Sequence, residues 1–270
     1  MARMRHGETE GKTHMGILES FSLAGRKALV TGAGRGIGRC LSQALAEAGA
    51  DLTAVDIDAD TARKAADEIG ALGVKTLAIQ ADVTKPDAVQ NTLDQHLKAM
   101  GRIDVVINNA GICVHVPAEE MTLKQWDDVM ELNLRGLFLV AQAAGRQMIT
   151  QKSGSIINIA SMSGSIVNTP QPQAAYNTSK AGVIMLTKSL AAEWAPKGVR
   201  VNSISPGYTK TEMAMQEHVK PFHPKWTGLI PMGRMAEVKE LAGAAVYLAS
   251  DASSYMTGHD LVVDGGYTAW

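Results

Sequence analysis

The chain has 270 residues with a formal net charge of −1, and 46% of them are hydrophobic, which is enough for a large core. The composition lacks the basic excess of a nucleic-acid binder and any apolar run long enough to span a membrane. Cys40 and Cys113 lie far apart, so they give neither a disulfide framework nor a cysteine-based zinc site. We therefore expect a cytoplasmic protein that binds neither nucleic acid nor membrane.

The first 22 residues are polar and lack an apolar core of signal-peptide length. We expect a mobile tail over residues 1–22. No internal repeat, low-complexity segment or linker divides the remaining chain, so residues 23–270 are expected to form a single domain.

From residue 26 onward, apolar runs of strand type alternate with helical patterns. Expected strands cover residues 26–32, 51–56, 75–82, 103–111, 155–161, 199–207 and 260–266. Expected helical segments cover residues 37–50, 58–73, 85–100, 122–151 and 238–250, with a further helix around Tyr176. Because the strands are apolar on both faces, this alternation predicts a doubly wound α/β fold, with a parallel sheet covered by helices on each side. Ligands of such sheets bind beyond the carboxyl ends of the strands.

The first expected strand leads into a glycine-rich turn, "TGAGRGIG", at residues 31–38. Such a turn lets the backbone approach a pyrophosphate and directs a helix N-terminus at its negative charge. An ordinary flexible turn is the structural alternative, and the position between a strand and an amphipathic helix argues against it. The expected cofactor contacts here are Gly32, Arg35, Gly36, Ile37 and Gly38.

Asp56 ends the second expected strand. A carboxylate at this place accepts hydrogen bonds from the ribose of an adenosine and repels a 2′-phosphate, which favours NAD over NADP. Arg35 favours NADP instead, because an arginine in the turn can bind a phosphate. The alternative for Asp56 is a solvated charge at the end of a strand.

The third and fourth strands also end in candidate ligand contacts. Asp82 can accept a hydrogen bond from an adenine amino group, or it can cap the next helix together with Thr84. Asn108 and Asn109 can tie neighbouring loops together. The candidate cofactor contacts at these two strand ends are Asp82, Val83, Asn109, Ala110 and Gly111.

In the stretch "AAYNTSKAG", residues 174–182, Tyr176 and Lys180 are four residues apart and surrounded by small side chains. Four residues bring both side chains to one face of a helix, and the small neighbours leave room for a ligand. The alternative is a surface helix with long side chains reaching into water.

Taken in order, the glycine turn, "DV", "NNAG", "ELNLRG", "NIASMSG", "YNTSK" and "SPGYTKT" resemble the short-chain dehydrogenase/reductase family over residues 23–270. This resemblance implies a single Rossmann-like domain that binds NAD or NADP. Position by position, it implies a catalytic tetrad of Asn133, Ser161, Tyr176 and Lys180. The family's usual spacing from serine to tyrosine would select Ser163, but "SMSG" aligns Ser161 and leaves Ser163 as a substrate contact.

The chemistry that the resemblance implies is the removal of a hydroxyl proton by Tyr176 as a hydride leaves carbon. Because a phenol has a pKa of about 10, we expect the Lys180 ammonium and the positive nicotinamide to lower it. Ser161 is expected to hold the substrate oxygen. Tyr176 and Lys180 are also expected to contact the cofactor, with Lys180 binding the nicotinamide ribose. For Asn133 the resemblance implies a backbone-carbonyl contact to a water, and the alternative is a buried amide that braces a helix.

After the sixth strand, "SPGYTKT" offers Pro206, Gly207, Thr209 and Thr211 as cofactor contacts, or a strand-ending turn with a threonine cap. Residues 208–235 follow as an expected substrate lid, with a packed helical hairpin as the alternative. His218 and His223 lack cysteine partners, so no zinc site and no other metal site is expected. The expected substrate contacts are Ser161, Ser163, Asn168, Tyr176 and Tyr208.

The ending "VDGGYTAW", together with the internal stretch "SMSGSIVN", is similar to the polyol-dehydrogenase branch of the family, whose substrates include galactitol, sorbitol and arabinitol. Amides in "NTPQPQ" suit a substrate with several hydroxyls. The resemblance thus implies an NAD-dependent oxidoreductase of sugar alcohols that forms a homotetramer. The alternatives are an NADPH-dependent 3-oxoacyl thioester reductase and a non-catalytic sensor of dinucleotides.

Overall fold

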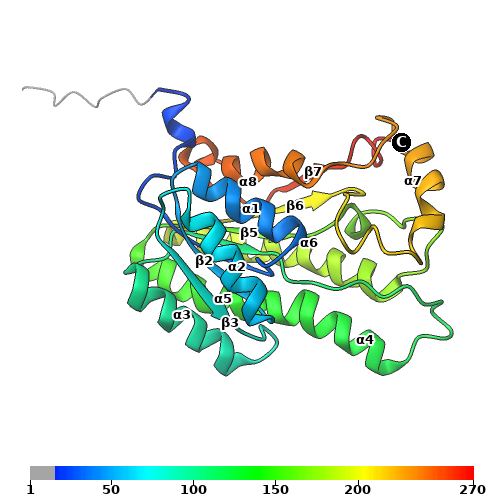
Figure 1. Cartoon of the computed structure of the whole chain (residues 1–270), viewed down its shortest axis with the longest axis horizontal. Coiled ribbons are helices and arrows are strands. Elements are labelled where there is room, and N and C mark those ends of the chain that lie inside the picture. Colours follow the sequence, from blue (N-terminus) through cyan, green and yellow to red (C-terminus); the bar gives the residue numbers. More distant parts are fainter. Residues whose placement is uncertain (1–15) are drawn as a thin grey trace, which may run out of the picture.

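The computed structural model describes residues 16–270 and confirms the doubly wound α/β fold (Figure 1). All seven strands are parallel and follow the order β3-β2-β1-β4-β5-β6-β7. The strands are β1 Lys27–Thr31, β2 Asp51–Asp56, β3 Thr76–Gln80, β4 Val105–Asn108, β5 Gly154–Ile159, β6 Val199–Pro206 and β7 Asp260–Val263. The order reverses between β1 and β4, which places the topological switch point beside the glycine turn.

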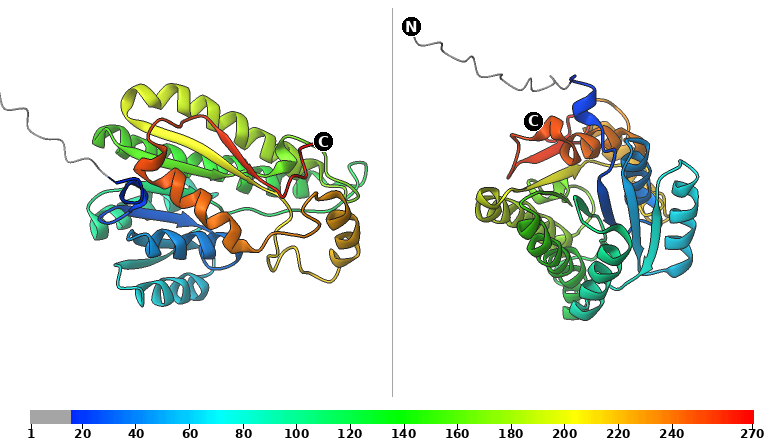
Figure 2. Two further views of the ribbon diagram at one scale, coloured as in Figure 1. Left: turned by 90° about the horizontal axis from the view of Figure 1, so that it is seen from above. Right: turned by 90° about the vertical axis from the view of Figure 1, so that its left-hand side faces the viewer.

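Helices cover both faces of the sheet (Figure 2). They are α1 Gly36–Glu47, α2 Ala59–Gly70, α3 Pro86–Met100, α4 Leu123–Met130, α5 Leu137–Gln151, α6 Ala174–Trp194, α7 His223–Leu229 and α8 Ala242–Ala249. One core lies between the sheet and α1, α2 and α8, and a second lies between the sheet and α3, α5 and α6. Within residues 16–270, none of the helices combines the length and apolar character that crossing a bilayer requires.

The strands supply side chains to both cores, as their apolar sequences predicted. In β1, Val30 belongs to the first core and its neighbour Leu29 to the second. Successive strand residues point to opposite faces, so a strand buried on both sides needs apolar residues at every position.

The helix expected over residues 122–151 is divided into three parts. A π-helical segment, Glu131–Gly136, separates α4 from α5. This segment contains Asn133, and π-helical turns often occur at functional sites. A hydrophobic pattern cannot predict such a turn, because one extra residue per turn hardly changes the periodicity.

The expected tail falls partly outside the described residues, which begin at residue 16. Within the described part, Glu19–Phe21 form a 3-10 turn, and the ring of Phe21 lies 6.1 Å from that of Tyr247 in α8. Leu23, the first residue of the expected domain, is fully buried, and the boundary at residues 22 and 23 stays a prediction.

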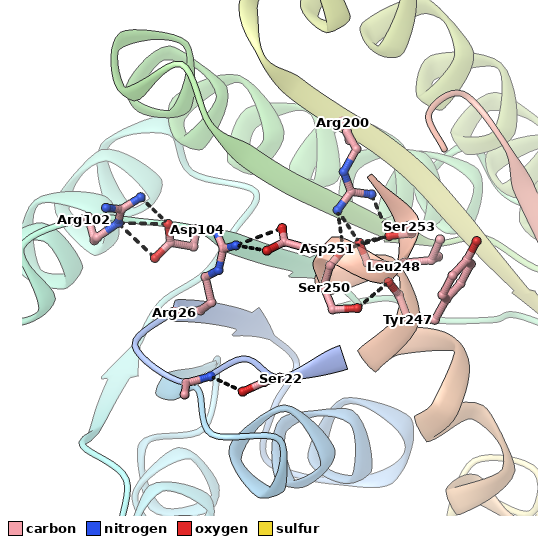
Figure 3. Close-up of polar contacts among 11 residues, drawn as sticks. Ser22, Arg26, Arg102, Asp104, Arg200, Tyr247, Leu248, Ser250, Asp251 and Ser253 are labelled. Atoms are coloured by element: carbon pink, nitrogen blue, oxygen red, sulfur yellow. Dashed lines mark hydrogen bonds and ion pairs between the residues drawn. The ribbon is translucent and has the colours of Figure 1, made fainter. Parts of the chain in front are cut away.

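A polar cluster joins the C-terminal segment to the amino ends of the strands (Figure 3). The Arg200 guanidinium in β6 donates to the backbone carbonyls of Leu248 and Ser250 and to the Ser253 hydroxyl. Arg26 pairs with Asp251 at 2.9 Å. These groups lie at the edge opposite the carboxyl ends of the strands, so they hold α8 against the sheet and leave the ligand edge free.

His96 in α3 is fully buried between two hydrogen-bond partners. Its Nδ1 atom lies 2.8 Å from the Thr53 hydroxyl, and its Nε2 atom lies 2.9 Å from the backbone carbonyl of Arg102. A neutral ring satisfies both, since Nε2–H donates to the carbonyl and Nδ1 accepts from the hydroxyl. Burial lowers the pKa of His96 from 6.5 to about 4.

We predict that the protein loses stability as the pH falls from 6.5 to 4. Between these two pH values His96 becomes protonated in the unfolded chain but stays neutral in the folded chain. This difference lowers the free energy of unfolding by up to about 3 kcal/mol. Urea denaturation across this pH range measures the slope. His96→Asn should flatten it, whereas the exposed His259→Asn should leave it unchanged. An unaltered slope in His96→Asn would contradict the assignment.

Candidate active site

A cavity of about 600 Å³ lies at the carboxyl edge of the sheet and extends from the glycine turn to the expected lid. Most of the residues singled out in the sequence line it. They are Gly32, Arg35, Gly36, Ile37, Asp56, Asp82, Val83, Asn109, Ala110, Gly111, Ser161, Ser163, Asn168, Tyr176, Lys180, Pro206, Gly207, Tyr208, Thr209 and Thr211. Gly38 and Asn133 lie outside the lining.

The glycine turn has the geometry of a phosphate cradle. Gly32 and Gly36 have φ values of +62° and +55°, a region that favours glycine. Gly38 is buried, and a Cβ atom there would lie 2.1 Å from the carbonyl oxygen of Gly32. Its role is thus to let α1 start directly against the turn, which leaves the free N–H groups of that helix beside the cavity. The residues present fit the diphosphate of a dinucleotide.

Asn108 and Asn109 tie the end of β4 to its neighbours, as one of the two interpretations predicted. The Asn109 amide donates to the backbone carbonyls of Thr31 and Gly32, each at 3.1 Å. Asn108 donates to the Asn158 side chain in β5 at 2.9 Å. These bonds set the spacing between the glycine turn and the loop that continues to Gly111.

Asp56 and Asp82 each form part of a turn at the ligand edge. Asp56 accepts from the backbone N–H of Gly34 at 2.9 Å. Asp82 accepts from the backbone N–H and the hydroxyl of Thr84, at 2.9 and 2.7 Å. Burial raises the pKa of Asp82, but the two bonds from Thr84 outweigh it and the pKa is lowered overall. Both carboxylates keep acceptor capacity beyond these bonds and line the cavity.

Tyr176 and Lys180 project from α6 toward the end of β5. The Lys180 ammonium lies 5.6 Å from the centroid of the Tyr176 ring and donates to the backbone carbonyl of Ile159 at 2.7 Å. Lys180 is buried and Tyr176 is partly buried, and burial lowers the pKa of Lys180 to about 8. Lys180 therefore remains mostly protonated at neutral pH, although its buried charge is not stabilised by surrounding water.

The pKa of Tyr176 is raised in the chain itself, whereas the expected lowering includes the charge of a bound nicotinamide. Burial raises the pKa of Tyr176, the neighbouring Cys113 raises it further, and a hydrogen bond from Ser161 lowers it only in part. The largest cause is the loss of water around the phenol, which disfavours its charged form. A bound nicotinamide supplies a second positive charge and the hydride acceptor.

Ser161 and Ser163 lie side by side at the same end of the cavity. Ser161 donates to the Ser163 hydroxyl at 3.0 Å and accepts from the Ser163 backbone N–H at 3.1 Å. Of the two serines, Ser161 is the one that lowers the pKa of Tyr176. This geometry favours Ser161 as the partner of the tyrosine and keeps Ser163 within reach of the substrate.

Asn133 braces the helices rather than lining the cavity. Its amide donates to the backbone carbonyl of Ile112 and accepts from the Ile112 N–H, each at 2.8 Å, and it donates to Ser179 in α6 at 3.1 Å. The Asn133 side chain thus braces the helices, which is the alternative role expected from the sequence. A role for its backbone carbonyl stays a prediction.

Aromatic and amide side chains form the far wall of the cavity. Tyr208 stacks on Trp226 of α7, with ring centroids 4.0 Å apart, and its hydroxyl accepts from Asn168 and Gln171 at 3.2 and 2.9 Å. The Trp226 indole donates to Gln171 at 2.9 Å. The segment expected as a lid therefore contains a short helix that packs against this wall, and its closure over a substrate stays a prediction.

Cys113 is a lining residue that sequence reasoning missed. Its sulfur lies 3.4 Å from Nε2 of His115, and burial raises the pKa of the thiol to about 12. The available signal was its place two residues after "NNAG", at a carboxyl strand end. Within residues 16–270, no group of three or more histidine, cysteine, aspartate or glutamate side chains is arranged to hold a metal ion.

A parallel sheet, a glycine turn at its switch point and a tyrosine–lysine pair in the same cavity define a dinucleotide-binding oxidoreductase. A family model described as enoyl-(acyl carrier protein) reductase matches residues 32–268. The chain belongs to the short-chain dehydrogenase/reductase family.

Characterised relatives resemble the chain over nearly its whole length. Galactitol 2-dehydrogenase (L-tagatose-forming) of Cereibacter sphaeroides is 43% identical and aligns over 93% of this chain and 98% of its own. D-arabinitol 2-dehydrogenase (ribulose-forming) of Scheffersomyces stipitis is 41% identical over 96% and 99%. The crystal structure of a short-chain dehydrogenase/reductase from Mycobacterium marinum has a TM-score of 0.92 and 47% identity, covering 94% of this chain and 100% of that one.

Similar solved structures contain either cofactor. A gluconate 5-dehydrogenase from Burkholderia cenocepacia in complex with NADP and tartrate has a TM-score of 0.88 and 37% identity, over 94% of this chain and 100% of that one. An NAD+-bound xylitol dehydrogenase has a TM-score of 0.85 and 35% identity, over 90% and 99%. Family membership therefore establishes a nicotinamide dinucleotide as the cofactor but not which one.

We predict that Tyr176→Phe abolishes turnover and spares dinucleotide binding. The substitution removes the acid/base hydroxyl, which should cost roughly 10²–10⁴-fold in kcat, and leaves the glycine turn intact. Steady-state kinetics and titration of NADH fluorescence measure the two effects. Tyr255→Phe, at an exposed tyrosine far along the chain, is the matched control. Turnover retained in Tyr176→Phe would reject the tyrosine as the base.

Proposed function

We propose that the protein is an NAD-dependent dehydrogenase that oxidises a secondary hydroxyl of a sugar alcohol to a ketone, and reduces the ketose in the reverse direction. The observation that carries this proposal is the shared cavity. Ser161, Tyr176 and Lys180 lie in the same cavity as the glycine turn, with the amide wall around Tyr208 also lining it.

In the proposed mechanism Tyr176 takes the proton of the reacting hydroxyl. The Ser161 hydroxyl donates to the same oxygen and stabilises the negative charge that develops there. Lys180 holds a positive charge near the Tyr176 ring, which favours the phenolate once the site is filled. Burial of these groups strengthens their electrostatic interactions, because little water is present to screen them.

A neutral, hydroxyl-rich substrate suits the far end of the cavity. Asn168, Gln171 and Gln173 supply amide donors and acceptors there. The cationic side chains among the lining residues are Arg35, at the glycine turn, and Lys180, beside Tyr176. The amide wall, formed by Asn168, Gln171 and Gln173, therefore has no cationic side chain of its own to bind a carboxylate. This favours a sugar alcohol over a sugar acid as the substrate. The names of the galactitol and arabinitol dehydrogenases above agree with this proposal.

NAD is the proposed cofactor because of Asp56. Its carboxylate lines the cavity at the end of β2, where the ribose of a bound adenosine would lie and a 2′-phosphate would be repelled. Arg35 lines the same region and supports the second candidate, an NADPH-dependent reductase of 3-oxoacyl thioesters.

The homotetramer and the cytoplasmic location stay predictions. Trp270 is 82% exposed in the single chain, and Met185 on α6 is 62% exposed. These are side chains that subunit contacts along α6 and the C-terminus would cover.

We predict NAD reduction with sugar alcohols of four to six carbons. The measurement is absorbance of NADH in a panel that includes galactitol and arabinitol, with gluconate as the charged comparison. Sugar alcohols should be preferred over gluconate, because the amide wall offers no counter-charge. Activity confined to NADPH and 3-oxoacyl thioesters would instead establish the second candidate.

We predict that Asp56→Ala relaxes cofactor choice. Removing a like charge near the 2′-phosphate should raise kcat/KM for NADP relative to NAD by on the order of tenfold. Asp60→Ala, at an exposed carboxylate in α2, controls for the general change in charge. If Asp56→Ala kept the wild-type ratio, Asp56 would not select the cofactor.

A further inference from the structure

Gln173 occupies the centre of a hydrogen-bonded chain at the substrate end of the cavity. It precedes α6, three residues before Tyr176, and is 6% exposed. Its Nε2 atom lies 3.3 Å from the Ser163 hydroxyl, 3.3 Å from the Asn168 carbonyl oxygen and 2.7 Å from that of Asn177. The two hydrogens of this amide group are shared among the three acceptors, with the shortest contact to Asn177, and together the contacts fix the orientation of the amide.

On one side the chain leads to the serine pair. Ser163 accepts from Gln173 and lies 3.0 Å from the hydroxyl oxygen of Ser161. A serine hydroxyl has one hydrogen and two lone pairs, so the N–H of Gln173 fills one acceptor position of Ser163. When Ser161 turns its hydrogen to a substrate oxygen, Ser163 can then donate its own hydrogen to Ser161.

On the other side the chain leads to the aromatic wall. Asn168 accepts from Gln173 and donates to the Tyr208 hydroxyl. Tyr208 also accepts from Gln171, to which the indole of Trp226 donates. Gln173 is thus hydrogen-bonded on one side to Ser163 and on the other side, through Asn168, to the wall against which α7 packs.

We propose that Gln173 is a positioning residue, whose amide orients the Ser161–Ser163 hydroxyl pair so that Ser161 donates to the reacting oxygen. The inference rests on the proposed function in one respect, that the reacting oxygen belongs to an alcohol or ketone. Bonds of this kind polarise one another along a chain, so a donor two steps away affects the last bond. Because Ser161 also lowers the pKa of Tyr176, losing this orientation should raise that pKa further.

The test is a double-mutant cycle with Gln173→Met, which keeps the shape and removes the amide, and Ser163→Ala. We expect Gln173→Met to lower kcat about tenfold, the size of one lost hydrogen bond in the transition state, with KM for NAD unchanged. The rise of kcat/KM with pH in the oxidation direction should move to higher pH. The double variant should be no slower than Ser163→Ala alone, because both changes break the same chain.

Gln90→Leu, at an exposed glutamine of α3, is the control for losing an amide, and thermal unfolding checks that each variant is folded. Additive losses of kcat, or wild-type kinetics and pH profile in Gln173→Met, would overturn the inference. If the wild-type enzyme is inactive on sugar alcohols, the proposed function is rejected but the role of Gln173 is not. The double-mutant cycle is then run with the alcohol or ketone that the enzyme does turn over. The crystal structure of Gln173→Met gives a substrate-free readout. We expect the serine oxygens to separate beyond 3.0 Å, and an unchanged pair would also overturn the inference.

Discussion

The site depends on the hydrogen bond between the Lys180 ammonium and the backbone carbonyl of Ile159, 2.7 Å long and fully buried. This bond joins α6, which carries Tyr176, to the end of β5, which leads directly to Ser161. A buried ammonium without a partner would be costly, so the contact constrains both elements strongly. This hydrogen bond therefore constrains the distance between Tyr176 and the Ser161–Ser163 pair. It also constrains the position of Gln173, which directly precedes α6.

Burial moves the pKa values of the two key groups apart. The pKa of Lys180 is lowered to about 8 and that of Tyr176 is raised, in each case first by loss of water. The chain alone therefore holds a neutral phenol, a resting state suited to donating a proton to a ketone. Oxidation needs the phenolate, and the positive ring of an oxidised nicotinamide favours it. The protonation of Tyr176 is in this way linked to the redox state of the cofactor.

The fold and the cofactor end of the site could be predicted from sequence because local pattern specifies them. The bounds of β2 were predicted residue for residue, and the glycine turn follows β1 as expected. Features set by tertiary contacts were not predicted. The π-helical turn contains Asn133, whose amide binds both backbone polar groups of Ile112, 21 residues away. The raised pKa of Tyr176 reflects burial, and the place of Gln173 depends on side-chain contacts with Ser163, Asn168 and Asn177.

The most direct test of the account is the crystal structure of the protein with NAD and a sugar alcohol that it oxidises slowly. The account predicts the diphosphate at the N-terminus of α1, and one carbinol oxygen within about 2.6–3.2 Å of both the Tyr176 and Ser161 hydroxyls, its hydrogen facing the nicotinamide. A substrate bound beside the nicotinamide with the Tyr176 hydroxyl out of reach would contradict it.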